Sequence, residues 1–210
     1  MKKKWYLNDV SIQNNNLDID PLVEKILYKR GINNDKAVKN FLNPDINNLH
    51  DPFQLQDMQA AVKKIKKAVA ENKDIIIYGD YDVDGITATT LLYNYFKNKY
   101  KIEIDYYVPD RLNEGYGLNL EAIKDIIEKG YELLITVDCG IAAISEVSYA
   151  ISKGLDIIIT DHHQPGNELP SATAVIDPYR ADDSYPFQSL AGVGVAFKLC
   201  QALENESSNI

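Results

Sequence analysis

Three aspartates stand at every second position in the stretch GDYDVDG, residues 79–85. Asp80, Asp82 and Asp84 directly follow an apolar run of strand type at residues 75–79. Ionised carboxylates this close repel one another, so a cation between them would stabilise the folded chain. In an extended stretch, residues i and i+2 lie on one face with their Cα atoms about 6.5–7 Å apart. We therefore expect Asp80 and Asp82 to bind one ion and Asp84, beyond the turn, to bind a second.

Two further polar clusters follow apolar runs. Asp138 comes directly after LLITV, and Asp161, His162 and His163 come directly after DIIIT. Ligand sites in open α/β folds form at the carboxyl ends of parallel strands, so all three clusters are expected at one edge of a sheet. Carboxylates and imidazoles without thiolates suit Mn²⁺ or Mg²⁺, with Zn²⁺, Fe²⁺ and Co²⁺ as alternatives. A pair of ions needs a bridging carboxylate, and Asp138 is the candidate.

Each cluster also has an ordinary interpretation. A single Asp after a strand is usually a helix cap or a turn former, and a His pair there is more often structural than catalytic. The D-x-D-x-D-G pattern resembles the opening of an EF-hand, but that loop requires Glu at its twelfth position. Counting from Asp80 places Leu91 there, which excludes an EF-hand. Three clusters at one edge together favour a metal site.

The elements that position these residues alternate along the chain from residue 74. Short apolar strands followed by helices predict right-handed βαβ units, and hence an α/β fold with a parallel sheet covered by helices on both faces. The predicted strands span residues 74–79, 101–109, 131–140, 155–163 and 172–178. The predicted helices between and after them span residues 86–100, 118–130, 141–154 and 192–204.

The leading part of the chain lacks this alternation. Residues 1–55 are rich in Asn and predict two short helices, one within 18–31 with Asp20 as its N-cap, and one within 33–44 that stops before Pro44. An amphipathic helix is predicted at 55–73, and its lysines are taken as a solvated face. We expect a helical extension over residues 1–55 and a main domain over residues 56–210.

Composition limits the class of protein. The chain has 31 Asp and Glu against 22 Lys and Arg, a formal net charge of −9, which argues against a simple electrostatic nucleic-acid binder. An enzyme that holds phosphates through metal ions remains compatible, because bound cations invert the local field. Cys139 and Cys200 are far apart and show no disulfide-like spacing, which indicates a reducing compartment. With no apolar run of about 18 residues and no signal-peptide pattern, we expect a soluble, cytoplasmic protein without membrane partners.

Several motifs together resemble a known superfamily. GDYDVDGITAT, ITVDCGI and the literal DHH at residues 161–163 resemble the first three motifs of the DHH phosphoesterases. VPDRLNEGYGLN, AVIDPYRADDSYPF and LAGVGVAFKLCQAL narrow the resemblance to the single-strand-specific 5′-to-3′ exonucleases of DNA repair and recombination. The resemblance covers residues 74–200. It implies a DHH-type catalytic domain with two Mn²⁺ or Mg²⁺ ions.

The resemblance also implies a metal ligand set. Asp80, Asp82 and Asp138 would hold one ion, and Asp84, Asp138 and His162 would hold the other. Asp84 and Asp138 would thereby belong to the catalytic machinery.

Other residues take roles around the metals by the same resemblance. Asp161 would orient its histidine neighbours, and His163 would contact the scissile phosphate as a catalytic and substrate-binding residue. Arg111 would contact a substrate phosphate, while Tyr116 would either stack on a base or serve packing. Asp177 is a departure, because Asn is expected there. A larger departure is the fourth-motif aspartate after the last helix, which the chain does not reach. We therefore expect the N-terminal piece of a longer enzyme, with weak activity alone.

The implied reaction is hydrolysis of a phosphodiester at the 5′ end of single-stranded DNA by a two-metal mechanism, with no covalent intermediate. One alternative is a DHH phosphoesterase acting on short oligonucleotides, cyclic dinucleotides or pyrophosphate, whose first motif carries His where this chain has Tyr78. Another is a non-catalytic module that binds DNA or a protein. The expected partners are single-stranded DNA and, beyond it, a single-strand-binding protein or a helicase.

Overall fold

The computed structural model describes residues 19–205. The chain divides into two units, Met1–Leu49 and His50–Ile210, and each is described by itself. The division lies six residues before the predicted boundary, because residues 50–55 pack with the second unit. Lys198 Nζ donates a hydrogen bond to the backbone oxygen of His50 at 2.6 Å, and Leu55 is buried in the core of that unit.

The first unit contains two short helices and a 3₁₀ turn. Helix α1 spans Pro21–Lys29, α2 spans Asp35–Leu42 and η1 spans Ile46–Asn48. Asp20 caps α1 by accepting the N–H of Leu22 at 2.7 Å, as its position before Pro21 predicts. Both helices are amphipathic, yet only Leu27 and Val38 of this unit's described residues are buried.

The second unit is built on a five-stranded sheet in which every strand pair is parallel. The order across the sheet is β2-β1-β3-β4-β5. The strands are β1 (Ile75–Gly79), β2 (Asp105–Tyr107), β3 (Leu133–Val137), β4 (Asp156–Thr160) and β5 (Ala174–Ile176).

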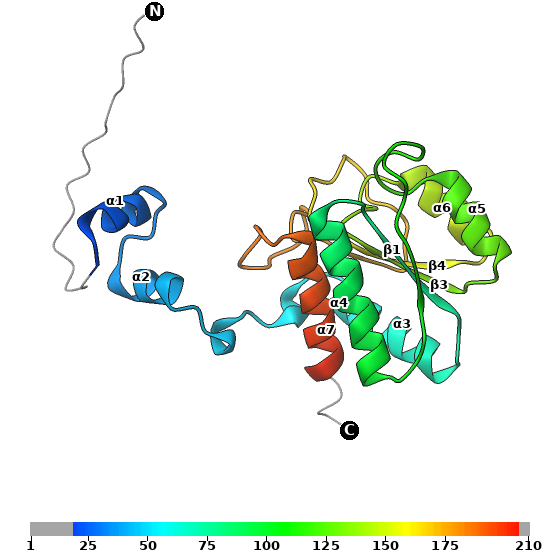
Figure 1. Ribbon diagram of the computed structural model, residues 1–210, viewed down its shortest axis with the longest axis horizontal. Helices are drawn as coiled ribbons and strands as arrows, with labels where there is room; N and C mark the ends of the chain where they lie inside the picture. Colours follow the sequence, from blue (N-terminus) through cyan, green and yellow to red (C-terminus); the bar gives the residue numbers. More distant parts are fainter. Residues whose placement is uncertain (1–18, 206–210) are drawn as a thin grey trace, which may run out of the picture. The chain divides into compact units, whose positions relative to one another are not determined.

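Helices cover both faces of this sheet (Figure 1). Helices α3 (Met58–Ala70), α4 (Val83–Lys99) and α7 (Gly192–Asn205) pack on one face, and α5 (Leu120–Glu128) and α6 (Ile144–Ser152) pack on the other. A 3₁₀ turn, η2 (Pro52–Gln54), precedes α3. The predicted fold class is therefore confirmed. None of the helices within residues 19–205 has the length and apolarity that crossing a bilayer would require.

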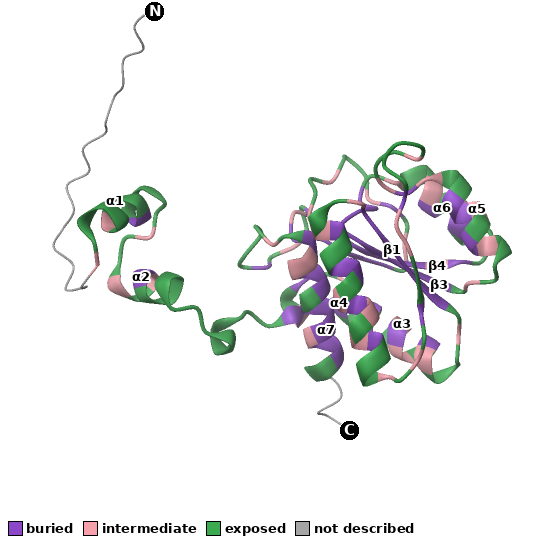
Figure 2. Ribbon diagram, in the orientation of Figure 1, coloured by how far each residue is buried: buried purple, intermediate pink, exposed green. Residues whose placement is uncertain are grey.

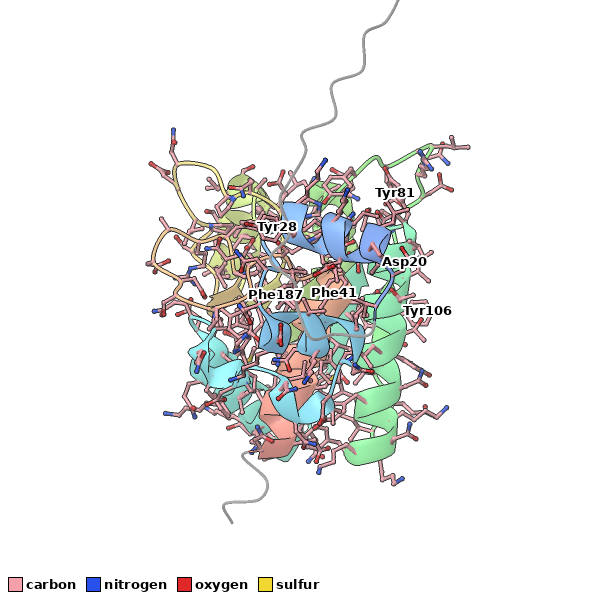
Figure 3. The ribbon with its side chains drawn as sticks, turned by 90° about the vertical axis from the view of Figure 1, so that its left-hand side faces the viewer. Asp20, Tyr28, Phe41, Tyr81, Tyr106 and Phe187 are labelled. Carbon is pink, nitrogen blue, oxygen red and sulfur yellow. The ribbon has the colours of Figure 1, made fainter. Side chains whose placement is uncertain are left out.

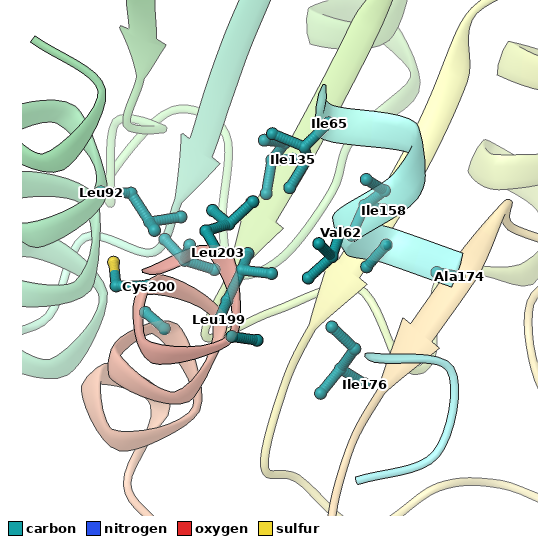
Figure 4. Packing of buried hydrophobic residues seen from close by; sticks show 14 of the residues in the cluster. Val62, Ile65, Leu92, Ile135, Ile158, Ala174, Ile176, Leu199, Cys200 and Leu203 are labelled. Atoms are coloured by element: carbon teal, nitrogen blue, oxygen red, sulfur yellow. The ribbon is translucent and has the colours of Figure 1, made fainter. Parts of the chain in front are cut away.

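Alternation along the strands divides the core between the two faces. Ile75 and Ile77 of β1 belong to the cluster under α3, α4 and α7, whereas Ile76 and Tyr78 belong to the cluster under α5 and α6. Because the central strands are buried on both faces, they read as continuous apolar runs in the sequence. Figure 2 shows β1 and β3 as buried throughout, and Figure 4 shows Leu199 of α7 packing towards the sheet with its neighbours.

The bounds of two elements differ from the sequence prediction for a reason that the structure shows. The strand predicted at 101–109 is paired only over Asp105–Tyr107, since it lies at the sheet edge with a single neighbour. Helix α4 begins at Val83 rather than at residue 86, because the Asp82 side chain caps it by accepting the N–H groups of Asp84 and Gly85 at 2.8 and 3.0 Å. Asp84 consequently lies in the first helical turn.

The strand order creates a crevice where the polar clusters fall. Strands β2 and β3 flank β1 on opposite sides, so the connections after β1 and after β3 run in opposite directions across the sheet. Such a reversal is the usual ligand site of doubly wound sheets. Asp80 directly follows β1 and Asp138 directly follows β3, so both lie at this crevice.

Candidate metal centre

Carboxylates and imidazoles from three strand ends converge at the crevice. Ligand atoms of Asp80, Asp82 and Asp138 lie within 4.8 Å of one another, and so do those of Asp138, His162 and His163. Asp138 belongs to both groups, whereas Asp84, which was expected together with Asp138 and His162, belongs to neither. The chain thus brings together residues that are more than 80 positions apart.

The end of β1 places a buried carboxylate in this cluster. Asp80 is 1% exposed, and its Oδ1 has no hydrogen-bond partner among the described residues. Burial raises the pKa of Asp80 above its ordinary range. Gly85 permits this packing, since a Cβ there would lie 2.5 Å from the backbone oxygen of Asp80. The first turn of α4 can therefore approach the strand end only with glycine at this position.

Asp138 is the most perturbed carboxylate of the cluster. It is 1% exposed, its φ is +61°, and its Oδ1 has no hydrogen-bond partner among the described residues. Burial, followed by repulsion from Asp84 and Asp82, raises its pKa to about 8. Left-handed backbone at a non-glycine residue is uncommon and tends to occur at functional sites. A cation at Oδ1 would compensate both the burial and the repulsion.

Asp84 has a structural role that the sequence does not reveal. Its two carboxylate oxygens accept the N–H groups of Gly192 and Val193, both at 2.7 Å. These amides form the N-terminus of α7, more than 100 residues further along the chain. Asp84 therefore fixes α7 against the crevice and satisfies two of its free donors.

His162 faces the two carboxylates with one ring nitrogen. Its Nε2 lies 3.0 Å from Oδ1 of Asp138 and 3.6 Å from Oδ2 of Asp84. Its Nδ1 lies 2.9 Å from the backbone oxygen of Leu190, a contact that requires Nδ1 to carry the proton. Nε2 is then left free to bind a cation. Ligands about 2.1 Å from an octahedral ion lie about 3 Å apart, which matches the separation of Nε2 from Asp138.

Asp161 is buried and holds His163. Its Oδ1 accepts hydrogen bonds from Nδ1 of His163 and from the N–H of His162, both at 2.7 Å, and its Oδ2 accepts the N–H of Ile141 at 2.9 Å. Asp161 thus holds His163 through its ring and His162 through its backbone N–H. The hydrogen bond to Asp161 is the main reason why the pKa of His163 is raised to about 9.

A loop over residues 110–119 borders the crevice. Tyr116 is 55% exposed, and its hydroxyl lies 3.1 Å from Nε2 of His163. Arg111 is exposed, with Cζ 5.4 Å from the ring centroid of Tyr81. A cavity of about 290 Å³ lies beside His163 and is bordered by Tyr116 and Glu146. Two of the three residues expected to contact substrate, Arg111 and Tyr116, thus lie on one loop beside the centre.

A further carboxylate follows β5. Asp177 is fully buried, and its Oδ1 accepts the N–H of Tyr179 at 2.7 Å. Its Oδ2 has no partner among the described residues, and burial raises its pKa to about 7. Sequence reasoning noted Asp177 only as a departure from an expected Asn. A neutral Asp177 carboxyl resembles the side-chain amide of the expected Asn in shape.

The donor set fits a hard divalent cation. Unpartnered oxygens of Asp80 and Asp138 and a free imidazole nitrogen of His162 face one region, and no thiolate takes part. Oxygen ligands with imidazole suit Mn²⁺ and Mg²⁺. The buried oxygens would remain unfavourable without such a partner.

Comparisons with known proteins agree with this geometry. The family model of the DHH family, N-terminal domain, matches residues 74–210, and that of the Toprim domain matches residues 20–107. The single-stranded-DNA-specific exonuclease RecJ of Bacillus subtilis is 46% identical over 190 residues, which cover 90% of this chain and 24% of the relative. RecJ of Escherichia coli is 38% identical over 191 residues, which cover 89% of this chain and 32% of the relative.

Two solved structures are also similar. The crystal structure of exonuclease RecJ bound to manganese has a TM-score of 0.67 and 33% identity, covering 73% of this chain and 38% of that one. RecJ of Thermus thermophilus in complex with Mn²⁺ has a TM-score of 0.68 and 26% identity, covering 91% of this chain and 28% of that one.

The sheet, the strand-end cluster and the family match define a DHH-type α/β domain, and the chain belongs to the DHH family. Within that family it is similar to the RecJ exonucleases, of which it spans about a quarter to a third of the length.

Proposed function

We propose that this chain is the metal-binding part of a single-strand-specific exonuclease that removes nucleotides from the 5′ end of DNA. The observation that carries the proposal is the convergence of unpartnered buried carboxylate oxygens and a free imidazole nitrogen at the β1/β3 crevice. The similarity to RecJ along most of the chain supports the choice of substrate.

In this proposal Asp80, Asp82 and Asp138 hold one divalent ion, and Asp138, Asp84 and His162 hold a second. Mn²⁺ or Mg²⁺ bound there would supply Lewis-acid activation of water and neutralise charge on the phosphate. The protein side chains then have a positioning task, since phosphoryl transfer is catalysed mainly by alignment and electrostatic stabilisation.

His163 supplies a positive charge beside the reacting phosphate. In the metal-free chain the hydrogen bond to Asp161 raises the pKa of His163 to about 9, so that the imidazole is protonated at neutral pH. A protonated ring can donate from Nε2 to a phosphoryl oxygen while Nδ1 stays bound to Asp161. To do so it has to exchange the Tyr116 hydroxyl, 3.1 Å away, for the substrate oxygen.

Arg111 and Tyr116 complete the proposed substrate contacts. Within residues 19–205 no carboxylate forms an ion pair with Arg111, so its guanidinium is available for bidentate phosphate binding. Tyr116 offers a half-exposed ring for stacking on a base. A cytoplasmic location and a role beside a single-strand-binding protein or a helicase belong to the same proposal.

The position of Tyr78 favours a polynucleotide substrate over the alternative small-substrate phosphoesterase. Tyr78 is buried, and its hydroxyl donates to the backbone oxygen of Gly117 at 2.9 Å. It stacks on Tyr107 with ring centroids 5.1 Å apart. Tyr78 thus supports the 110–119 loop from inside instead of adding a ligand to the centre.

The test is a directional cleavage assay with Mn²⁺. A 5′-phosphorylated 20-nucleotide strand labelled at its 3′ end should shorten stepwise from the 5′ end, and Asp138→Ala or EDTA should stop the shortening. A dinucleotide substrate run in parallel separates the alternatives. Shortening from the 3′ end, or hydrolysis of the dinucleotide alone, would contradict the proposal. Metal-dependent binding of the strand without hydrolysis, when it is also found for a longer chain that includes the expected fourth-motif aspartate, would assign the chain to the binding-module alternative.

A further inference from the structure

A second cavity lies beside the metal centre, between α4 and the edge strand β2. It has a volume of about 410 Å³, and its lining includes Ile86, Thr90 and Tyr93 from α4 and Tyr106 and Val108 from β2 and the residues after it. We call it the α4–β2 groove. None of the seven described residues that line it carries a carboxylate, although the chain as a whole is acidic.

Two tyrosine rings form a corner in this groove. Tyr106 pairs in register with Ile77, so its side chain is on the face of the sheet that α4 covers. Its ring is edge-on to that of Tyr93, with centroids 5.8 Å apart and planes 84° apart. Tyr106 nevertheless remains 62% exposed, and Figure 3 shows it beside α4, with Tyr81 nearer the N-terminal end of that helix.

The groove runs along α4 from just after the helical turn that carries Asp84. Ile86 lies two residues after Asp84 and is 48% exposed. From Asp84 to Tyr93 the helix rises about 13 Å, since each residue adds about 1.5 Å. With a rise of about 3.4 Å per stacked nucleotide, that axial distance alone corresponds to about four nucleotides. Asp84 and Tyr93 are nine residues apart and lie on opposite sides of α4, so a strand held at the metals has to pass around the start of the helix to reach Tyr93.

A polar group in the groove and a charged group beside it suit a nucleic-acid strand. Lys97 places its ammonium 5.9 Å from the ring centroid of Tyr93, where it can meet a backbone phosphate. Asn94 lines the cavity and offers an amide that can pair with a base edge. Aromatic rings for stacking beside a cation for the backbone are the recurrent parts of single-strand binding sites.

We propose that the α4–β2 groove binds the bases of a single strand a few nucleotides beyond the one held at the metal centre, with Tyr106 and Tyr93 as the stacking surface. The proposal rests on the proposed function, because it assumes that a polynucleotide occupies the metal centre. It makes Tyr106 a determinant of how strongly the chain prefers longer strands over dinucleotides.

The experiment measures binding by fluorescence anisotropy, with Mn²⁺ present and with phosphorothioate linkages that resist hydrolysis. The probes are 5′-phosphorylated oligothymidylates of eight and of two nucleotides. The variants are Tyr106→Ala, Tyr106→Phe and Lys97→Gln. Matched controls come from α6, where Lys153 lies 5.7 Å from the ring centroid of Tyr149 with the same i, i+4 spacing. These controls are Tyr149→Ala and Lys153→Gln, and circular dichroism checks the folding of every variant.

We expect Tyr106→Ala to weaken octamer binding at least about fivefold, the lower end for loss of one base stack. Dinucleotide binding should be unchanged. Tyr106→Phe, which keeps the ring, should stay within twofold of the unaltered chain. Lys97→Gln should weaken octamer binding and reduce its salt dependence, because it removes one phosphate contact. The α6 controls should have no effect.

Other outcomes overturn the proposal in distinguishable ways. Suppose that Asp138→Ala abolishes octamer binding while Tyr106→Ala binds the octamer as tightly as Tyr149→Ala does. Binding of bases by the α4–β2 groove is then refuted, and the proposed function stands. If the unaltered chain binds neither probe with Mn²⁺, the proposed function fails together with the groove. A dimer in sedimentation velocity that Tyr106→Ala dissociates would assign the groove to a second copy of the chain.

Discussion

Replacing Asp138 by asparagine is expected to stabilise the metal-free chain at neutral pH. The carboxyl is buried beside Asp82 and Asp84, and its pKa is raised from the ordinary 3.8 to about 8. Asparagine keeps the shape of the Asp138 side chain and tolerates the positive φ of residue 138. It removes the charge that burial and repulsion oppose.

The magnitude follows from proton linkage. Between pH 3.8 and about pH 8, Asp138 holds a proton in the folded state but not in the unfolded state. Stability then falls as pH rises, by about 1.4 kcal/mol per pH unit. From pH 5 to pH 7 the charge of Asp138 therefore lowers the free energy of unfolding by about 2–3 kcal/mol. Above about pH 8 both states are ionised and this contribution becomes constant.

Urea unfolding in EDTA, followed by far-ultraviolet circular dichroism, measures this effect. The difference in unfolding free energy between Asp138→Asn and the unaltered chain should grow by about 2–3 kcal/mol from pH 5 to pH 7. Saturating Mn²⁺ should reverse the order of stability at pH 7, since the carboxylate then has a cation. A difference that is the same at both pH values would refute the assignment of a raised pKa to Asp138.

Three further predictions concern the surroundings of the centre. Gly192→Ala places a methyl group against the Asp138 carboxylate, so Mn²⁺ affinity in calorimetry should fall at least about tenfold; unchanged affinity would show that the helix end can move away. Asp161→Asn removes the main cause of the raised His163 pKa, which should drop from about 9 towards 6.5 in an NMR titration; a value that stays near 9 would contradict this. In the longer protein, His163→Ala should spare Mn²⁺ binding but lower turnover about 10²- to 10³-fold, and unchanged cleavage rates would exclude His163 from the mechanism.

Much of the fold and of the site can be predicted from the sequence, because both follow from local patterns. The apolar runs before Asp80, Asp138 and Asp161 identify parallel strands buried on both faces. Parallel strands end at one edge of the sheet, so the carboxylates that follow them must converge. Asp80, Asp82, Asp138 and His162 are accordingly found in groups of converging ligand atoms, whereas Asp84 is in neither group, and the ions that these residues hold remain a proposal.

The remaining features depend on contacts between distant segments. The pairing of Asp84 with the N-terminus of α7 joins residues more than 100 positions apart, and no local pattern indicates it. The orientation of His162 depends on a backbone oxygen, that of Leu190, which any residue type would supply. Helix α4 begins three residues before its predicted start, because Asp82, which the sequence favours as a metal ligand, also caps the helix.

The most direct test of the centre is a crystal of the chain grown with Mn²⁺ and measured at a wavelength where manganese scatters anomalously. The arrangement of side chains predicts two peaks about 3.5–4 Å apart, with Asp138 in contact with both. His162 should contact only one of them, and Asp80 the other. Peaks remote from Asp138, or its carboxylate turned away from any bound metal, would contradict the shared centre on which the proposed function depends.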